Sequence, residues 1–171
     1  MEERLRYILS TVNEWLKFAE AKNGALLAVD TAIIFGIFKL ASDSAWPHAI
    51  FSYLTISLVI ASAVSCLVSF IPRIKIPTVT LNQKPNTGVS LLFYAHIAKY
   101  DPESYLKDLY GQSDSTTPSS SFEMDFARQI VTNSGIAVKK YHCFTVALWL
   151  TVVALILLLI AGIAMITLAS A

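Results

Sequence analysis

The chain has 171 residues, enough for one ordinary domain, and 55% of them are hydrophobic, which is more than a typical soluble domain carries. Its net charge of +1 gives no case for nucleic-acid binding, so we expect no nucleic acid as a partner. The sequence contains no phosphate-binding glycine loop, no HExxH and no paired-cysteine motif, so we expect no enzyme activity, no catalytic residue, no metal site and no cofactor.

The first predicted element is an amphipathic cytoplasmic helix over residues 1–23. Its apolar residues recur at intervals of three and four, which is typical of one buried helix face. These residues are Leu5, Ile8, Leu9, Val12, Trp15, Leu16 and Ala19. No helix breaker precedes Gly24, so we expect one unbroken helix over residues 3–41 that continues into the membrane.

Residues 24–41 form the predicted first transmembrane helix. The apolar run is at the lower length limit for crossing about 30 Å of hydrocarbon, and it contains Asp30. A charge inside a membrane is costly, so such a residue usually has a function. Three interpretations stay open: Asp30 faces a polar seam between helices, pairs with a neighbouring subunit, or is drawn toward the membrane interface.

A short periplasmic loop at 42–46 separates this helix from the second predicted span, residues 47–71. Ser57, Ala61, Ser65 and Ser69 recur there every four residues, a spacing that allows close helix contact. Two interpretations stay open for this face. It serves packing of three helices within one chain, or it forms a pore or oligomer seam that Asp30 helps to hydrate.

Residues 72–143 form a predicted cytoplasmic insert that ends in a helix. Residues 72–85 read as an irregular linker or edge strand, residues 89–100 as a short, largely buried helix, and residues 112–121 as a flexible loop. Between them, Asp101 as N-cap, Pro102 at the first helical position and Gly111 as a stop signal predict a second short helix.

The serines at 119–121 and Glu123 predict the start of a last helix. This helix is expected to run unbroken into the third span, residues 144–170, which is uncharged and long enough to cross the membrane. Cys66 and Cys143 lie in or beside spans, where we expect reduced, apolar-facing thiols.

The distribution of lysine and arginine predicts the topology. Basic residues occur in the N-terminal segment and throughout 72–143, whereas the short loop carries none. We therefore predict an all-α integral membrane protein of one domain, with three transmembrane helices and a cytoplasmic N-terminus. The first and last helices extend into the cytoplasm, where a small helical insert joins them.

A set of polar and aromatic residues on the insert has the chemistry of a nucleotide site. A small anionic ligand needs cations for phosphate, an aromatic face for a base, and amide groups for its edges. The candidate ligand-binding residues are Tyr94, His96, Lys99, Arg128, Gln129 and Asn133. Four of them also have an ordinary interpretation, because His96 suits a hydrogen-bonded helix position and Arg128, Gln129 and Asn133 suit a solvated helix face. Lys139, Lys140 and Tyr141 suit membrane-interface anchors.

Three stretches, FAEAKNGALLA, FYAHIAKYDPESYL and DFARQIVTNSGIAVKKY, resemble the membrane effectors of Pycsar antiphage systems. The resemblance runs over about residues 12–150. It implies a multi-pass protein of the bacterial inner membrane, encoded beside a pyrimidine nucleotide cyclase. Cyclic UMP or cyclic CMP, made on phage infection, would activate it to impair the membrane and cause abortive infection.

The family pattern has an acidic residue, a lysine and a small residue before the first span, where this chain has Glu20, Lys22 and Asn23, with glutamate in the acidic place. The resemblance implies that these residues, with Asp30, couple ligand sensing to movement of the spans. Membrane lipid and other copies of the chain, in a homo-oligomer, are further expected partners.

Other functions stay open beside this one. The chain could be a two-span effector of another nucleotide-signalling defence system, or a non-enzymatic structural or regulatory membrane subunit. A transporter-like ion pathway is disfavoured because the sequence shows no inverted repeat.

Overall fold

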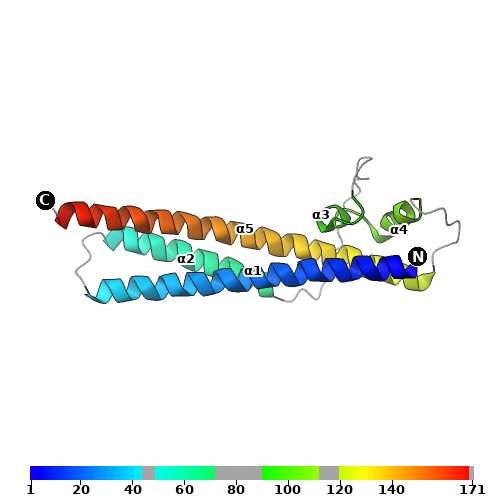
Figure 1. The fold of residues 1–171 in the computed structure, drawn as a ribbon, viewed down its shortest axis with the longest axis horizontal. Coiled ribbons are helices and arrows are strands. Elements are labelled where there is room, and N and C mark those ends of the chain that lie inside the picture. Colours follow the sequence, from blue (N-terminus) through cyan, green and yellow to red (C-terminus); the bar gives the residue numbers. More distant parts are fainter. Residues whose placement is uncertain (44–48, 72–89, 112–119, 170–171) are drawn as a thin grey trace. The chain divides into compact units, whose positions relative to one another are not determined.

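The computed structural model describes residues 1–43, 49–71, 90–111 and 120–169, and within these ranges every regular element is a helix (Figure 1). The helices are α1 (Glu2–Asp43), α2 (Ala49–Phe70), α3 (Tyr94–Ile97), α4 (Pro102–Gly111) and α5 (Ser121–Ala169). The all-α class is confirmed. The predicted linker at 72–85, most of the predicted loop at 42–46 and most of the loop at 112–121 lie outside the described residues.

The two long helices, α1 and α5, are each unbroken, with 42 and 49 residues (Figure 1). Neither contains proline, the residue that breaks a helix interior, and the glycines within them are tolerated at a modest cost. The predicted continuous helices are therefore confirmed.

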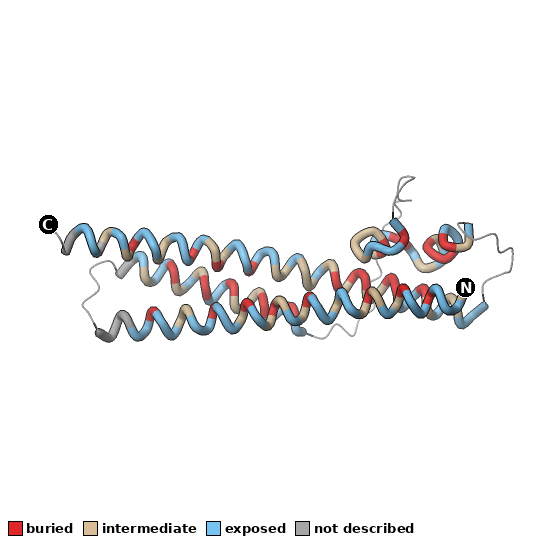
Figure 2. The backbone as a smooth tube through the Cα atoms, viewed as in Figure 1, coloured by how far each residue is buried: buried red, intermediate tan, exposed pale blue. Residues whose placement is uncertain are grey.

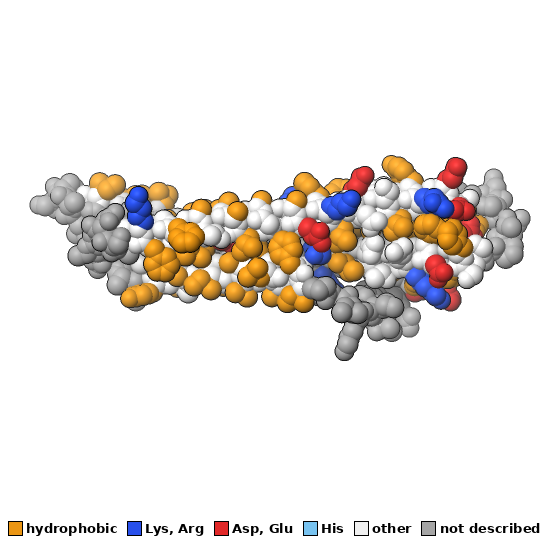
Figure 3. All heavy atoms as spheres, turned by 90° about the horizontal axis from the view of Figure 1, so that it is seen from below, with side chains coloured by type: hydrophobic (Ala, Val, Ile, Leu, Met, Phe, Trp, Pro, Cys, Tyr) orange, Lys and Arg blue, Asp and Glu red, His pale blue; other side chains and the backbone are white. Residues whose placement is uncertain are grey.

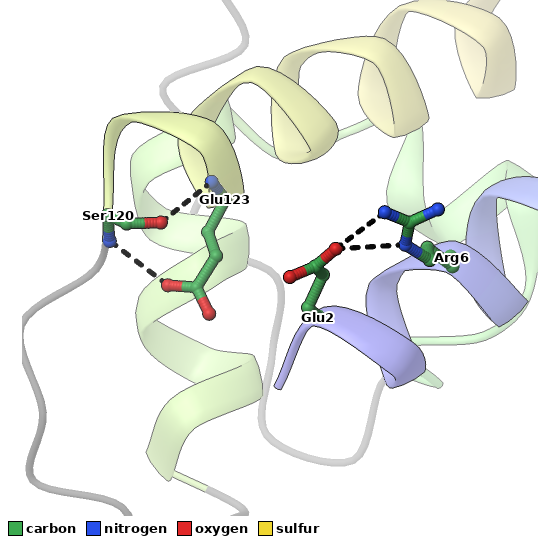
Figure 4. Close-up of polar contacts among 4 residues, drawn as sticks. All are labelled: Glu2, Arg6, Ser120 and Glu123. Carbon is green, nitrogen blue, oxygen red and sulfur yellow. Dashed lines mark hydrogen bonds and ion pairs between the residues drawn. The ribbon is translucent and has the colours of Figure 1, made fainter.

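The helices begin as their sequences dictate. Asp101 Oδ1 accepts hydrogen bonds from the amides of Glu103 and Ser104, at 3.1 and 3.0 Å, and so caps α4. At the start of α5, the Ser120 amide donates to Glu123 Oε2 at 3.0 Å and the Glu123 amide donates to Ser120 Oγ at 3.2 Å (Figure 4). This reciprocal capping box confirms the predicted helix start.

The chain divides into two compact units. The polar unit comprises residues 1–19 and 72–141, and the apolar unit comprises residues 20–71 and 142–171. Since α1 and α5 each pass through both units, each unit contains one part of both long helices.

The polar unit has a continuous hydrophobic core. Apolar residues of α1 and α5 form one side of this core, and residues of α3, α4 and the segments beside them form the other side (Figure 2). The buried members are Leu5, Ile8, Val12, Leu91, Ile97, Tyr100, Tyr105, Leu106, Leu109, Ala127, Ile130 and Val131. Within this core, the Tyr105 hydroxyl donates to the Leu91 carbonyl at 3.0 Å, so α4 is tied to the chain before α3.

The predicted helix over residues 89–100 is much shorter than expected. Only Tyr94–Ile97 is helical, because Phe93 at its N-cap has an extended backbone (φ −87°, ψ 120°). Just before it, the Leu92 amide donates to Ser90 Oγ at 3.3 Å, a local bond that favours a turn over a helix. The predicted burial is also only partial, since Leu92, Phe93 and Lys99 are exposed.

In the apolar unit, α1 and α5 run in the same direction and α2 runs against them (Figure 1). The described part of the chain contains three helices long and apolar enough to cross a membrane. Large hydrophobic side chains point outward from them, with Phe35 70% and Ile166 71% exposed. On the face drawn in Figure 3, hydrophobic side chains cover most of this unit. A helix bundle with such a surface is suited to lipid as its solvent.

The face of α2 that packs within the chain is not the predicted serine face. Its buried residues are Thr55, Val59, Ser62, Cys66 and Ser69. Ser57 and Ala61 are exposed, and Ser57 and Ser65 donate to carbonyls of their own helix at 2.8 and 2.9 Å. A strict four-residue repeat drifts around a helix by about 40° per step, whereas alternating steps of four and three stay on one side.

Candidate functional site

Aromatic rings from three helices meet in the polar unit. Tyr94 of α3 stacks on Tyr141 of α5, with ring centroids 5.2 Å apart and planes inclined by 24°. The ring of Trp15 from α1 lies 5.5 Å from Tyr94, inclined by 39°. We call these residues, together with Phe93 and His96, the aromatic cluster.

Phe93 links the two predicted ligand residues of α3. Its ring lies 4.8 Å from Tyr94 and meets His96 edge-on at 5.3 Å. His96 Nδ1 is buried and has no hydrogen-bond partner among the described residues. The predicted residues Tyr94 and His96 are therefore brought together by their contacts with Phe93, and His96 carries an unsatisfied ring nitrogen.

A hydrogen bond to the backbone connects two helices of the cluster, and burial affects the ionisation of its central ring. The Tyr141 hydroxyl donates to the Trp15 carbonyl at 3.4 Å, which joins α1 and α5 directly. Burial raises the pKa of the Tyr94 phenol above its ordinary value, so this ring stays neutral at physiological pH. Chemically, such a cluster offers flat faces for a planar base and a nitrogen for one edge of that base.

The other predicted ligand residues do not share this cluster. Lys99 and Gln129 are exposed, and Arg128 pairs with Asp125 of its own helix at 3.5 Å. Both side chains of this pair are about two-thirds exposed, so the contact contributes little to stability. The cationic residues expected to bind phosphate therefore lie on the surface of the polar unit.

Asn133, also predicted to bind ligand, pairs two helices. Its Nδ2 donates to Asn13 Oδ1 at 2.8 Å, which connects α5 to α1 beside the polar-unit core. Asn13 was not singled out from the sequence, although it interrupts the apolar face between Val12 and Leu16. Trp15 lies on that same face, and nothing in the neighbouring sequence distinguishes it from the other apolar residues.

The predicted coupling residues lie on α1 within the apolar unit. The Lys22 ammonium lies 5.4 Å from the centroid of the Phe144 ring of α5, a cation–π contact. Asn23 and Asp30 are fully buried, and Glu20 is partly exposed. Polar side chains therefore occur along this part of α1 within the apolar unit.

Asp30 occupies a polar junction of all three apolar-unit helices. Ser62 Oγ of α2 donates to its Oδ2 and Thr151 Oγ1 of α5 donates to its Oδ1, both at 2.7 Å. The two hydroxyl oxygens lie 2.8 Å apart, and both lie near the Ala147 carbonyl, at 2.9 Å from Ser62 Oγ and 3.1 Å from Thr151 Oγ1. Of the three interpretations for Asp30, the polar seam between helices is the one that the structure shows.

Neither cysteine belongs to the aromatic cluster or to the polar junction around Asp30. Cys66 is a buried free thiol in the core of the apolar unit, beside Leu26 and Ala147, and Cys143 is free and partly exposed. Among the described residues, no three His, Cys, Asp or Glu side chains gather where they could hold a metal ion.

The similarity of this chain to known proteins extends over residues of both units. The family model described as the Pycsar effector protein domain matches residues 4–168. The Pycsar effector protein PtPycTM of Propioniciclava tarda is 30% identical over 140 residues, which cover 78% of this chain and 65% of that relative. No solved structure matches the chain significantly. Since the matched residues run from the first turn of α1 to the last turn of α5, the chain belongs to the Pycsar effector family.

Proposed function

We propose that the chain is an antiphage defence effector that a cyclic pyrimidine mononucleotide, cyclic UMP or cyclic CMP, switches on to impair the bacterial inner membrane. The infected cell then dies or stops growing before phage can spread. The observation that carries this proposal is the family match over residues 4–168. Three helices long and apolar enough to cross a membrane support an action within the bilayer.

The proposal assigns the remaining parts of the system. A partner cyclase makes the nucleotide, and the effector itself performs no enzymatic reaction. Its N-terminus and polar unit lie in the cytoplasm, where the nucleotide is made, and several copies assemble in the membrane. The basic residues of the N-terminal segment and of 72–143 support this orientation.

The aromatic cluster is the proposed binding place for the pyrimidine base. Stacking on an aromatic side chain suits any base, and a free ring nitrogen such as His96 Nδ1 can contact one edge of it. Lys99 is the proposed partner of the cyclic phosphate, because it is an exposed cation only three residues after His96. Arg128 and Gln129 precede Tyr141 by 13 and 12 residues on α5, about 18–20 Å along the helix axis, so we do not assign them to the same bound nucleotide.

Binding in the polar unit can act on the membrane only if the ligand favours one helix arrangement over another. The cluster contains residues of both α1 and α5, and each of these helices continues without a break into the apolar unit. A base that stacks on Tyr94 and separates it from Trp15 and Tyr141 would therefore act on two membrane helices together.

The test is ion current across planar lipid bilayers that contain the purified full chain. Cyclic UMP, cyclic CMP, cyclic AMP and buffer alone are added in parallel. We expect current with at least one cyclic pyrimidine and none with cyclic AMP or buffer. Absence of current with every nucleotide, in protein shown to be inserted, would favour the structural or regulatory subunit instead.

A further inference from the structure

We propose that Asp30 is the residue that selects cations in the pathway opened by the active effector, with Ser62 and Thr151 as its oxygen-bearing partners. This inference rests on the proposed function, because it concerns what passes through the membrane once the effector is active. It assigns the permeating species by charge, which the family membership does not.

Oxygen atoms from three helices converge at the junction around Asp30. Each of the three apolar-unit helices presents oxygen to one point: Asp30 Oδ1 and Oδ2 from α1, Ser62 Oγ from α2, and Thr151 Oγ1 with the Ala147 carbonyl from α5. Carboxylate, carbonyl and hydroxyl oxygens are the ligands of hard cations such as Na⁺, K⁺ and Ca²⁺. Anions would instead need N–H donors or cationic side chains, which this junction does not present.

Within the described part of the chain, the Asp30 carboxyl group has no cationic partner at this junction. Asp30 is fully buried, and both of its hydrogen-bond partners are neutral hydroxyls. Among the described residues, no lysine, arginine or histidine forms an ion pair with it. An ionised Asp30 in a water-filled pathway would therefore have no neighbouring cation, in the ranges that the structure describes, to cancel its charge. In a medium of low dielectric constant it attracts cations and repels anions much more strongly than it would in water.

The distances between the oxygens of the junction show how far the helices would have to separate to admit a cation. The oxygens of the junction lie only 2.7–3.1 Å from one another, so no space for an ion remains between them in this arrangement. A cation with oxygen ligands at about 2.3–2.6 Å needs oxygens on its opposite sides about 4.6–5.2 Å apart. Separation of the helices by roughly 2 Å at this level would thus turn the junction into a ring of oxygens wide enough for a partly dehydrated cation.

Charged and carbonyl oxygen rings of this kind select cations in channels by replacing water around the ion. The hydrogen bonds seen here keep the same groups satisfied while the helices are together, which explains how a carboxylate is tolerated inside the apolar unit. The junction is accordingly both a closing contact in this arrangement and an ion-facing surface in the open one.

The experiment is the reversal potential of the nucleotide-activated current under a gradient of potassium chloride, with the full chain in planar bilayers. We expect wild type to prefer K⁺ over Cl⁻ by about tenfold or more, as a focused carboxylate field produces. Asp30→Asn keeps the size and a hydrogen-bond acceptor but removes the charge, so current should persist with a permeability ratio near one. Asp30→Glu should restore the preference for K⁺.

Two control variants distinguish the effect of the Asp30 charge from the effects of another carboxylate and of the neighbouring hydroxyls. Asp125→Asn removes an exposed carboxylate from the polar unit and should leave the K⁺ preference unchanged. The double variant Ser62→Ala with Thr151→Val loses the hydroxyls but keeps the carboxylate, so cation preference should persist. If Asp30→Asn fails to insert, the wild-type reversal potential can still overturn the inference, because a current that carries Cl⁻ as well as K⁺ contradicts it.

Either of two results would overturn the inference while leaving the proposed function intact. One is a nucleotide-activated wild-type current that carries Cl⁻ as well as K⁺, and the other is full K⁺ preference in Asp30→Asn. Absence of any nucleotide-activated current removes the proposed function, and the inference with it.

Discussion

At the scale of single residues, Tyr94 contacts three other aromatic rings of the polar unit. These rings are those of Trp15, Tyr141 and Phe93, yet Tyr94 belongs to a helix of only four residues. So short a helix has no stability of its own, and its position depends on these side-chain contacts. Each aromatic pair contributes about 0.5–1.5 kcal/mol beyond burial, so a stacking ligand has comparable energy with which to displace the ring.

Replacement of Tyr94 tests this role directly. We expect Tyr94→Ala to weaken cyclic pyrimidine binding by about 5- to 150-fold, because stacking of one base on one aromatic ring contributes about 1–3 kcal/mol. Tyr94→Phe keeps the ring and should bind within a small factor of wild type. The measurement is isothermal titration calorimetry on the purified full chain in detergent.

Phe122→Ala is the matched control, since it removes a half-exposed ring that contacts Phe126 and not the aromatic cluster. It should leave the affinity unchanged. Equal losses for Tyr94→Ala and Phe122→Ala would show that the cluster has no special part in binding.

At the scale of the elements, the helix starts differ in how firmly they are held. The first turn of α1 has an exposed ion pair, with Arg6 Nη2 2.6 Å from Glu2 Oε1, which contributes only a few tenths of a kcal/mol (Figure 4). The first turn of α5 has the capping box of Ser120 and Glu123. In addition, Glu123 accepts a hydrogen bond from the Tyr110 hydroxyl near the end of α4.

This contact fastens α4 to the start of α5. The hydrogen bond raises the pKa of Tyr110 to about 12 and lowers the pKa of Glu123 below its ordinary value of 4.5. Because the pKa of Glu123 is lower in the folded chain than in the unfolded one, its ionised form stabilises the fold above pH 4.5. That stabilisation is lost as the pH falls through the folded value.

The start of α5 should therefore loosen in acid. We expect the amides of Ser120, Glu123 and Met124, which donate hydrogen bonds at this helix start, to exchange faster relative to the intrinsic rate as the pH is lowered from 6 through about 4. Glu123→Gln cannot ionise, so it should exchange faster than wild type at pH 6 and lose this pH dependence.

Asp125→Asn serves as the comparison, because its carboxylate lies in the same helix turn but forms only an exposed pair with Arg128. It should keep the wild-type pH profile. A wild-type profile in Glu123→Gln would mean that another group governs the start of α5.

At the scale of the whole molecule, the continuity of α1 and α5 is the feature on which signalling depends. Each helix contributes a ring to the aromatic cluster and an oxygen to the Asp30 junction. A helix transmits displacement along its axis only while its ladder of backbone hydrogen bonds is intact. A break between residues 19 and 23 of α1 should consequently separate binding from membrane action.

Ala21→Pro makes such a break at an exposed position between the last residue of the polar unit and Asn23. Proline there removes one helix hydrogen bond and clashes with the preceding turn, at a cost of about 3 kcal/mol or more. We expect unchanged nucleotide affinity by calorimetry and a nucleotide-activated current reduced by at least about tenfold, since 1.4 kcal/mol corresponds to a factor of ten.

Ala21→Gly is the control, because it weakens the helix by only about 1 kcal/mol and introduces no ring. It should retain most of the current. Wild-type current in Ala21→Pro would exclude α1 as the route between the units and leave α5 as the remaining continuous helix.

Features that depend on neighbouring residues or on the thickness of a bilayer can be predicted from the amino-acid sequence. The lengths of the apolar runs indicate three spans, because hydrocarbon thickness sets the number of apolar residues required. The absence of proline from residues 2–43 and 121–169 indicates unbroken helices, and Asp101, Ser120 and Glu123 mark helix starts through bonds to amides two or three residues away.

Contacts between residues that are distant in the sequence could not be predicted in this way. Asp30 finds donors 32 and 121 residues further along the chain, and Tyr141 bonds to a carbonyl 126 residues before it. The spacing of small residues on α2 indicated a contact face but not that the seam would include Ser62 and not Ser57. Periodicity identifies a helix and its apolar side, whereas the rotation of each helix against its neighbours depends on how all the side chains pack at once.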